Sequence, residues 1–348
     1  MDSSTPRLLD SSTILAIDIG GTKLAIGVVR RDEFRATGRL AAVTKEPVPA
    51  PGTPDVVIAR VIAIARELLA AEGGRLDAIG ISIGGPLDHT TGTVVNFPHL
   101  PEWRMIPLCS EISDALGAPA SLDNDANLGA LAESRLGAGR GVADLVYLTI
   151  STGIGGGVIV GGRLLHGVGS GAGEVGHITV ESNGPICPCG NRGCLEMMAS
   201  GTAIARRARA LAELDPAQGE ALIRQAGGDT AAITSQHVVA AMIAGDPMAT
   251  AIWESTAEFI AIGLGSIIHI LAPSMIILGG GVAQTGELLL EPVRARLRNH
   301  VFYIPLDRIA VVSAALGHDS ALLGAACLAA AGEESGGGGD DSLSKTGS

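Results

Sequence analysis

A strand–turn–strand unit that occurs twice constrains the fold of this chain more than any other feature. The segments "IDIGGTKLAIGVV" (17–29) and "LTISTGIGGGVIV" (148–160) each consist of an apolar run, a turn rich in glycine and threonine, and a second apolar run. Short apolar runs bounded by glycine turns are typical of buried strands. Two such units far apart predict a duplicated α/β fold, whose glycine turns would face each other across a cleft.

Strand and helix patterns alternate between and after these two units. Residues 55–73 form an amphipathic pattern that ends in a glycine pair, and residues 76–88 form a buried strand that ends in a glycine turn. The helical pattern of 125–137 follows the acidic triplet "DND" directly. A third glycine turn occurs in "IILGGGVA" (276–283). The pattern therefore predicts packed α/β layers with many glycine turns.

The length of 348 residues favours two domains. We expect an N-terminal lobe at 13–122, completed by a helix at about 319–331, and a C-terminal lobe at 123–318. Residues 1–12 and 332–348 are polar or of low complexity and are predicted to be disordered.

No secretion signal is recognisable at the N-terminus, because "MDSSTPRLLDSS" lacks an apolar core. The uncharged stretch 259–286 contains Pro273 and glycines at 279–281, so it fits a buried helix and a buried strand better than a membrane span. We therefore expect a cytoplasmic protein without a membrane partner.

The composition restricts the ligands. The net charge is −12 and only 2% of residues are aromatic, which disfavours nucleic acid and aromatic carbohydrate platforms as binding modes. A small anion would have to be held by local backbone dipoles or by a cation.

"DIGGTK" (18–23) has two interpretations. It can be an ordinary hairpin turn, or its glycine N–H groups can approach a phosphate while Asp18 holds Mg²⁺ through water. The flanking Asp18 and Lys23 favour the second interpretation. "STGIGGG" (151–157) supplies hydroxyls and N–H donors at the matching turn. A P-loop is excluded, because G-x-x-x-x-G-K-[ST] does not occur.

Two other motifs are ambiguous. "GAGEVG" (171–176) matches a dinucleotide fingerprint in letters, but it lacks the preceding strand and the following helix, so we reject that interpretation. The triplet Asp123, Asn124 and Asp125 can cap a helix, or one carboxylate can act as general base towards an alcohol. Spacing alone leaves these two interpretations equally supported.

Three of the five cysteines crowd into "HITVESNGPICPCGNRGCLE" (177–196). A disulfide, a redox pair and a metal site are the alternatives. C-x-x-C is absent, and a cytoplasmic protein disfavours a disulfide. His177, Cys187, Cys189 and Cys194 make a Cys₃His set, which predicts structural Zn²⁺ with all four positions filled by protein. Cys109 and Cys327 lie in apolar segments and are expected in the core.

Taken together, "DIGGTK", "DNDAN", "STGIGGG", "EVGH", "CPCGNRGCLE" and "ILGGGVA" resemble the ROK family of sugar kinases, within the hexokinase and actin-like ATPase superfamily. The motifs cover about residues 14–330. The resemblance implies an α/β, two-lobed actin-like ATPase fold, a duplicated ribonuclease H-like fold, with ATP and a hexose bound in an interlobe cleft. It also implies a homodimer or a homotetramer.

Roles follow from the resemblance position by position. Asp125 would be the catalytic base, and the sugar would also contact Gly85, Asn124, Glu174, His177 and Glu196. ATP and its Mg²⁺ would contact Asp18, Gly20, Gly21, Thr22, Lys23, Thr152, Gly153, Gly280 and Gly281. Lobe closure would exclude water during phosphoryl transfer.

The resemblance implies phosphorylation of a hexose at its 6-hydroxyl, with glucose as the first candidate. "CPCGNRGCLE" looks like bacterial glucokinases, whereas Gly84-Gly85 replaces the Pro-Gly of many relatives and is closer to N-acetylmannosamine kinases. N-acetylglucosamine is a further alternative substrate. A sugar-sensing transcriptional regulator is disfavoured, because Gly20 leaves no room before it for a helix-turn-helix domain. A nucleotide-binding scaffold without catalysis is disfavoured by the intact "DND" and "DIGGTK".

Overall fold

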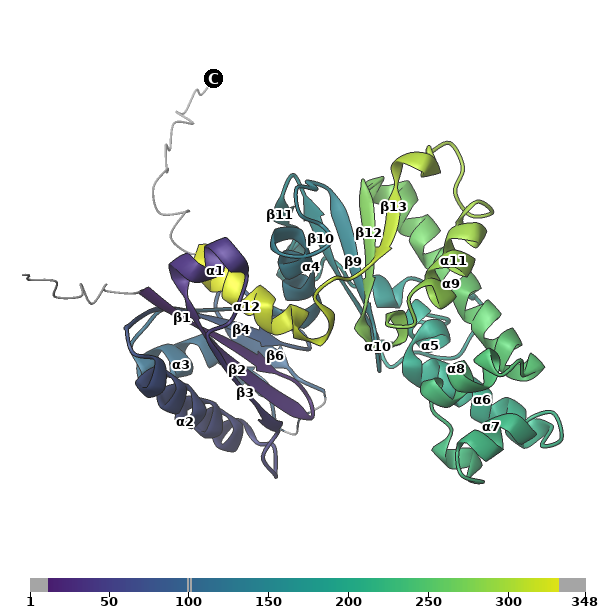
Figure 1. Cartoon of the computed structure of the whole chain (residues 1–348), viewed down its shortest axis with the longest axis horizontal. Coiled ribbons are helices and arrows are strands. Elements are labelled where there is room, and N and C mark those ends of the chain that lie inside the picture. Colours follow the sequence, from purple (N-terminus) through teal and green to yellow (C-terminus); the bar gives the residue numbers. More distant parts are fainter. Residues whose placement is uncertain (1–11, 99, 101, 332–348) are drawn as a thin grey trace, which may run out of the picture. The chain divides into compact units, whose positions relative to one another are not determined.

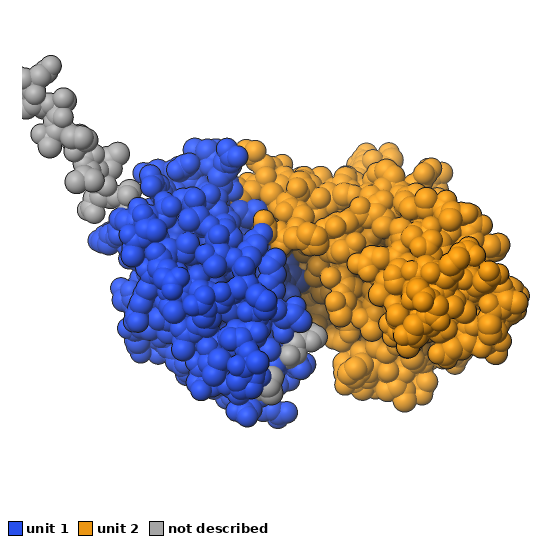
Figure 2. Space-filling model, turned by 60° about the horizontal axis from the view of Figure 1, so that its bottom comes forward, with its two compact units in different colours: residues 1–128, 321–348 blue, residues 129–320 orange. Residues whose placement is uncertain are grey.

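The computed structural model describes residues 12–98, 100 and 102–331 of the chain (Figure 1). Two compact units are present, and Figure 2 shows them in blue and orange: unit 1 comprises the residues up to Leu128 and those from Ala321, and unit 2 comprises Gly129–Ser320. The domain boundaries near residues 122 and 318 stay predictions. The expected disorder at 1–11 and 332–348 lies outside the described residues. At Ser12 the expectation is wrong, because this residue begins the first strand, hydrogen-bonded in the sheet.

The two units contain sheets of the same topology, which confirms the duplicated α/β fold. The strand order is β3-β2-β1-β4-β8 in unit 1 and β11-β10-β9-β12-β13 in unit 2. In unit 1 the first three strands are antiparallel, whereas β1, β4 and β8 are parallel. Unit 2 repeats this arrangement, with antiparallel β11, β10 and β9 followed by parallel β12 and β13.

Unit 1 is built on this sheet and a small antiparallel sheet, β5-β6-β7. The strands are β1 (Ser12–Ile19), β2 (Lys23–Arg30), β3 (Ala42–Pro47), β4 (Arg75–Ile83), β5 (Leu87–Asp88), β6 (Thr93–Asn96), β7 (Arg104–Ile106) and β8 (Ala120–Asn124). The helices are α1 (Arg31–Thr37), α2 (Pro54–Glu72), α3 (Leu108–Leu116) and α12 (Ser320–Ala331). The helix α4 (Asp125–Arg135) spans the boundary between the two units.

Unit 2 is richer in helices. Its strands are β9 (Leu145–Ile150), β10 (Ile154–Val160), β11 (Arg163–Leu164), β12 (Met275–Gly279) and β13 (Ala310–Ser313). Its helices are α5 (Leu195–Ala199), α6 (Gly201–Leu214), α7 (Glu220–Gln225), α8 (Ser235–Ile243), α9 (Pro247–Leu271), α10 (Gly280–Ala283) and α11 (Glu287–Leu297). The segment "GAGEVG" has the single 3₁₀ turn Val175–His177 at its end, so its rejection as a dinucleotide motif is confirmed.

Alternating strand residues supply the cores. In β1 the side chains of Leu15, Ile17 and Ile19 pack with those of α2 and α3. In β9 the side chains of Val146, Leu148 and Ile150 pack against the helices of unit 2, whereas Leu145 and Tyr147 pack on the opposite face. A period of two along a strand sends neighbouring side chains to opposite faces, so both faces of each sheet are covered.

The uncharged stretch 259–286 begins within the helix α9, which ends at Leu271. This helix is long and apolar enough to cross a membrane, and 61% of an apolar 18-residue window in it is buried inside the protein. Trp253, Ile260 and Leu264 belong to the core of unit 2. The strand β12 follows and is also buried. The expected buried helix and buried strand are thus confirmed, and the helix starts earlier than the pattern indicated.

In unit 1, α12 packs against the sheet at a glycine. A Cβ atom at Gly80 would lie 1.9 Å from the backbone oxygen of Ala325. We expect Gly80→Ala to lower the free energy of unfolding by about 3 kcal/mol or more, because the helix must move away from the sheet. Thermal and urea unfolding measure this change.

Gly281→Ala is the matched control for this variant. Its added methyl would lie 3.9 Å from the nearest atom, the Ser151 hydroxyl oxygen. An equal loss of stability in both variants would contradict the close packing of α12 at Gly80.

Candidate functional site

In unit 1, polar side chains gather where the three parallel strands end. Asp18 pairs with Ser82 across β1 and β4, and Ser82 pairs with Asp123 across β4 and β8. The Ser82 hydroxyl donates a hydrogen bond of 2.7 Å to Asp18 Oδ1. The carboxyl ends of parallel strands are the usual location of ligand sites in α/β proteins. The bond from Ser82 fixes the orientation of the Asp18 carboxylate there.

The three residues of the acidic triplet differ in burial and in their hydrogen bonds. Asp123 is buried, and its Oδ1 accepts hydrogen bonds from the backbone N–H of Asn124 and from Asn127 Nδ2. Asn124 Oδ1 accepts from the N–H of Ala126 and so caps α4. Asp125 is exposed, and its Oδ1 also accepts from Ala126 at 2.9 Å. The capping interpretation therefore applies to Asn124, and the general-base interpretation of Asp125 stays a prediction.

Two glycine turns flank this edge of unit 1. The first is the hairpin turn between β1 and β2, closed by a 2.9 Å bond from Gly20 N to Lys23 O. Gly21 is half-buried within it, and Thr22 and Lys23 are exposed. "DIGGTK" is thus a hairpin turn in structure, and its contact with phosphate stays a prediction.

The second turn lies beside the start of α4. Gly85 has a φ of +89°, and a Cβ atom there would lie 2.3 Å from Asn96 O. A Cβ atom at the preceding Gly84 would lie 3.8 Å from Asp125 Oδ2 and 3.1 Å from the Phe97 ring. The structure therefore brings the predicted residues Gly85, Asn124 and Asp125 together within unit 1.

In unit 2, the turn 151–153 lies beside the turn after β12. β9 and β12 are parallel, and Gly279 pairs with Thr149. Gly280 has a φ of +83°, and a Cβ atom there would lie 2.5 Å from Ile150 O. Only glycine allows this approach. The structure therefore brings the predicted residues Thr152, Gly153, Gly280 and Gly281 together.

A cavity of about 550 Å³ opens next to these two turns. Thr152 and Gly281, two of the residues predicted to contact ATP, line it. Sequence reasoning missed most of its other lining residues, among them Thr202, Arg209, Gln236, Val239, Ile243 and Trp253. Trp253 could have indicated this site in the sequence, because the chain has only two tryptophans. The volume of the cavity suits a small-molecule ligand.

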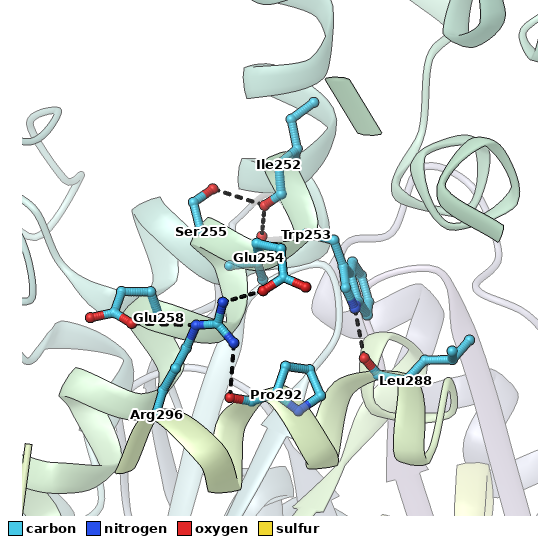
Figure 3. Close-up of polar contacts among 9 residues, drawn as sticks. Ile252, Trp253, Glu254, Ser255, Glu258, Leu288, Pro292 and Arg296 are labelled. Carbon is cyan, nitrogen blue, oxygen red and sulfur yellow. Dashed lines mark hydrogen bonds and ion pairs between the residues drawn. The ribbon is translucent and has the colours of Figure 1, made fainter. Parts of the chain in front are cut away.

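Hydrogen bonds between α9 and α11 fix the position of Trp253, the residue of α9 that lines this cavity (Figure 3). Trp253 Nε1 donates to Leu288 O at 2.8 Å. Arg296 bonds Glu254, lies 3.4 Å from Glu258 and donates to Pro292 O. These contacts join the two helices on the side of α9 where Trp253 is anchored, so the indole has a fixed position in the cavity wall.

The four predicted metal ligands come together in the loop 177–196. The ligand atoms of His177, Cys187, Cys189 and Cys194 all lie within 4.8 Å of one another. Cys187 Sγ is 3.7 Å from His177 Nδ1, and Cys189 Sγ is 3.7 Å from Cys194 Sγ. A tetrahedral zinc site with Zn–S bonds of 2.3 Å places its sulfurs about 3.8 Å apart. The donor set and its spacing fit Zn²⁺.

The thiols of this cluster differ in environment. Burial raises the pKa of Cys187 and raises that of Cys194 to about 12, whereas a hydrogen bond with the backbone of Asn191 lowers the pKa of the exposed Cys189. Without a cation, burial therefore disfavours ionisation of Cys187 and Cys194. A bound metal would supply the charge that stabilises three thiolates, with release of protons on binding.

The predicted sugar residues of unit 2 lie at the two ends of this loop. His177 turns Nδ1 towards the cysteines, while its Nε2 lies 3.7 Å from Glu174 Oε2. Glu196 is placed differently, because its Oε2 accepts a 2.9 Å hydrogen bond from Ile154 N, next to the turn 151–153. Glu174 and His177 are thus brought together, and Glu196 contacts the turn assigned to phosphate.

Known proteins match this chain over most of its length. A glucokinase of Thermotoga maritima is 35% identical over 90% of this chain and 96% of its own. An N-acetylmannosamine kinase of Citrobacter koseri is 33% identical over 90% of this chain and 98% of its own. A xylose repressor of Caldicellulosiruptor bescii is 32% identical over 72% of this chain and 61% of its own.

The same resemblance holds in three dimensions. The structure of a ROK family glucokinase from Streptomyces griseus in complex with glucose and AMPPNP has a TM-score of 0.75 and 35% identity, over 91% of this chain and 99% of the other. The profile of the ROK family matches residues 14–331. The chain therefore belongs to the ROK family.

Proposed function

We propose that this protein is a sugar kinase that transfers the γ-phosphoryl group of ATP to the 6-hydroxyl of a hexose, with glucose as the acceptor. The similarity to glucokinases over nine-tenths of the chain carries this proposal. The two glycine turns beside a cavity in unit 2 and the exposed Asp125 in unit 1 support it.

Phosphoryl transfer needs positioning and charge neutralisation more than covalent chemistry. Asp125, fixed at the start of α4, would accept the proton of the attacking hydroxyl. Asn124, Gly85, Glu174, His177 and Glu196 would contact the sugar. Mg²⁺ bound with ATP would neutralise phosphate charge, and Asp18 is the residue that would hold it, because Ser82 orients its carboxylate at the strand end.

The remaining predicted residues would bind the nucleotide. Gly20, Gly21, Thr22 and Lys23 would contact the transferring phosphate, Thr152 and Gly153 the other phosphates, and Gly280 and Gly281 the adenosine. Backbone N–H groups at glycine turns make concave sites for anions. Such local donors fit a protein whose net charge of −12 repels anions at long range.

The proposed zinc is structural. With His177, Cys187, Cys189 and Cys194 as ligands, every position of a tetrahedral ion is filled by protein. Coordination at Nδ1 would direct His177 Nε2 away from the metal, on the side where Glu174 lies. The ion would therefore orient a sugar-binding imidazole without itself touching the sugar.

N-acetylmannosamine is the second candidate acceptor, because a kinase for it is 33% identical to this chain. N-acetylglucosamine is a further candidate. A cytoplasmic location and a homodimeric or homotetrameric assembly stay predictions, and light scattering of the purified protein determines the assembly.

The acceptor can be identified by coupled ADP release with glucose, mannose, N-acetylglucosamine, N-acetylmannosamine and fructose. We expect the highest kcat/KM with glucose. Turnover of an N-acetylated sugar alone would identify the protein as a kinase of N-acetylated hexoses instead. Absence of turnover on all five sugars would refute the proposed function.

Asp125→Asn tests the base. We expect kcat to fall by a factor of about 10² to 10⁴, since the amide cannot accept the proton, while the unfolding temperature stays unchanged. Asp114→Asn, at an exposed position of α3, is the matched control and should retain the wild-type kcat. A near-normal kcat in Asp125→Asn would contradict the assignment of Asp125 as the catalytic base.

Cys189→Ser tests the metal. We expect loss of zinc, measured by elemental analysis, and a higher KM for the sugar, because the loop that carries His177 and Glu196 loses its order. Ser182→Ala, exposed in the same loop, should retain both the metal and the KM. Loss of zinc with an unchanged sugar KM would contradict the proposal that the metal orders the sugar site.

A further inference from the structure

Hydrogen bonds from the chain that follows the loop 177–196, here called the metal loop, hold the turn 151–153, here called the phosphate turn. The N–H of Gly201 donates to Ser151 O at 2.7 Å, and the N–H of Thr202 donates to Thr152 O at 3.4 Å. On the other side of the turn, Glu196 Oε2 accepts from Ile154 N at 2.9 Å. The backbone conformation of this turn therefore depends on Glu196 and on the start of α6.

The Glu196 carboxylate packs directly on the turn. A Cβ atom at Gly153 would lie 2.4 Å from Glu196 Oε2, so a larger residue would displace the carboxylate from this position. The φ of Gly153 is not in the left-handed region, and its backbone conformation alone does not require glycine. The effect of a side chain at position 153 would therefore act on Glu196.

The sequence connects this carboxylate to the metal loop. Glu196 lies two residues after Cys194, whose side chain is completely buried, in the first turn of α5. The N–H of the intervening Leu195 donates to Ile178 O at 2.8 Å, which ties this point to the residue after His177. The loop that gathers the metal ligands thus ends at the hydrogen bond to Ile154.

We propose that Glu196 is the positioning residue of the phosphate turn, so that it determines nucleotide affinity in the absence of sugar. This inference rests on the proposed function, in which Thr152 and Gly153 contact phosphates. A sugar contact can use Oε1, because the hydrogen bond to Ile154 occupies Oε2. A single carboxylate then contacts the sugar and also positions the turn that binds the nucleotide. Loss of order in the metal loop would therefore weaken nucleotide binding.

Nucleotide binding without sugar tests this role. Isothermal titration of the full chain with Mg²⁺ and AMPPNP should give a Kd about 10- to 100-fold higher in Glu196→Ala, because a hydrogen bond to a charged acceptor is lost. Glu196→Gln retains a neutral acceptor for Ile154 N and should rescue most of the affinity, with a Kd less than about fivefold above wild type.

Glu181→Ala is the matched control, since Glu181 Oε1 accepts only from Asn183 N within the same loop among the hydrogen bonds of the described residues. It should leave the Kd unchanged. Unfolding temperature and zinc content are measured for each variant. If Glu196→Ala does not fold, Gly153→Ala tests the proposal through its rise in Kd. An unchanged Kd in folded Glu196→Ala, or in Gly153→Ala where Glu196→Ala does not fold, overturns the proposal. A wild-type protein that does not bind AMPPNP refutes the proposed function instead.

Gly153→Ala gives an independent test by a double-mutant cycle. The methyl group should displace Glu196 and raise the Kd for AMPPNP about as much as Glu196→Ala does. In the Glu196→Ala background the same methyl meets no carboxylate, so the second loss should be small. Two fully additive losses would mean that Gly153 and Glu196 act independently, which contradicts the proposal.

Discussion

The backbone around Ile150–Ile154 is packed so closely that three separate segments must present glycines to it. A Cβ atom at Gly280 would lie 2.5 Å from Ile150 O, one at Gly176 would lie 2.1 Å from Ile154 O, and one at Gly201 would lie 2.8 Å from Ser151 O. The start of α10, the segment before His177 and the start of α6 therefore share one constraint. Phosphate binding by backbone N–H groups also favours glycine, because a residue without a Cβ atom leaves its N–H accessible.

This constraint gives a physical reason for the unusual composition. Forty-nine glycines and few aromatic residues would weaken an ordinary core, because glycine loses the most conformational entropy on folding. Here glycines allow backbones to approach one another, as where α12 meets the sheet at Gly80 and where Gly324 of α12 meets Leu128 O of α4. Stability then derives from close packing of small side chains over both faces of each sheet.

Much of this architecture could be predicted from the sequence, because its signals are local. The strand–turn–strand units, the helix ending at Gly73 and the four metal ligands all follow from short-range patterns. Two things could not be predicted. The cavity wall draws on α6, α8 and α9, whose proximity arises only from tertiary packing. The different environments of Asp123, which is buried, and Asp125, which is exposed, depend on tertiary packing, which spacing alone does not reveal.

The position of Glu196 also explains why a metal suits this loop. The 20 residues from His177 to Glu196 begin at the end of a 3₁₀ turn and end in the first turn of α5. Between these ends they contain two isolated backbone bridges and few buried apolar side chains. Such a segment cannot gain its order from a hydrophobic core. Four ligands on one ion would fix both ends at once, because His177 lies at one end and Cys194 is two residues from the other. The proposed zinc would therefore set the geometry of both substrate contacts through the backbone, without taking part in the reaction.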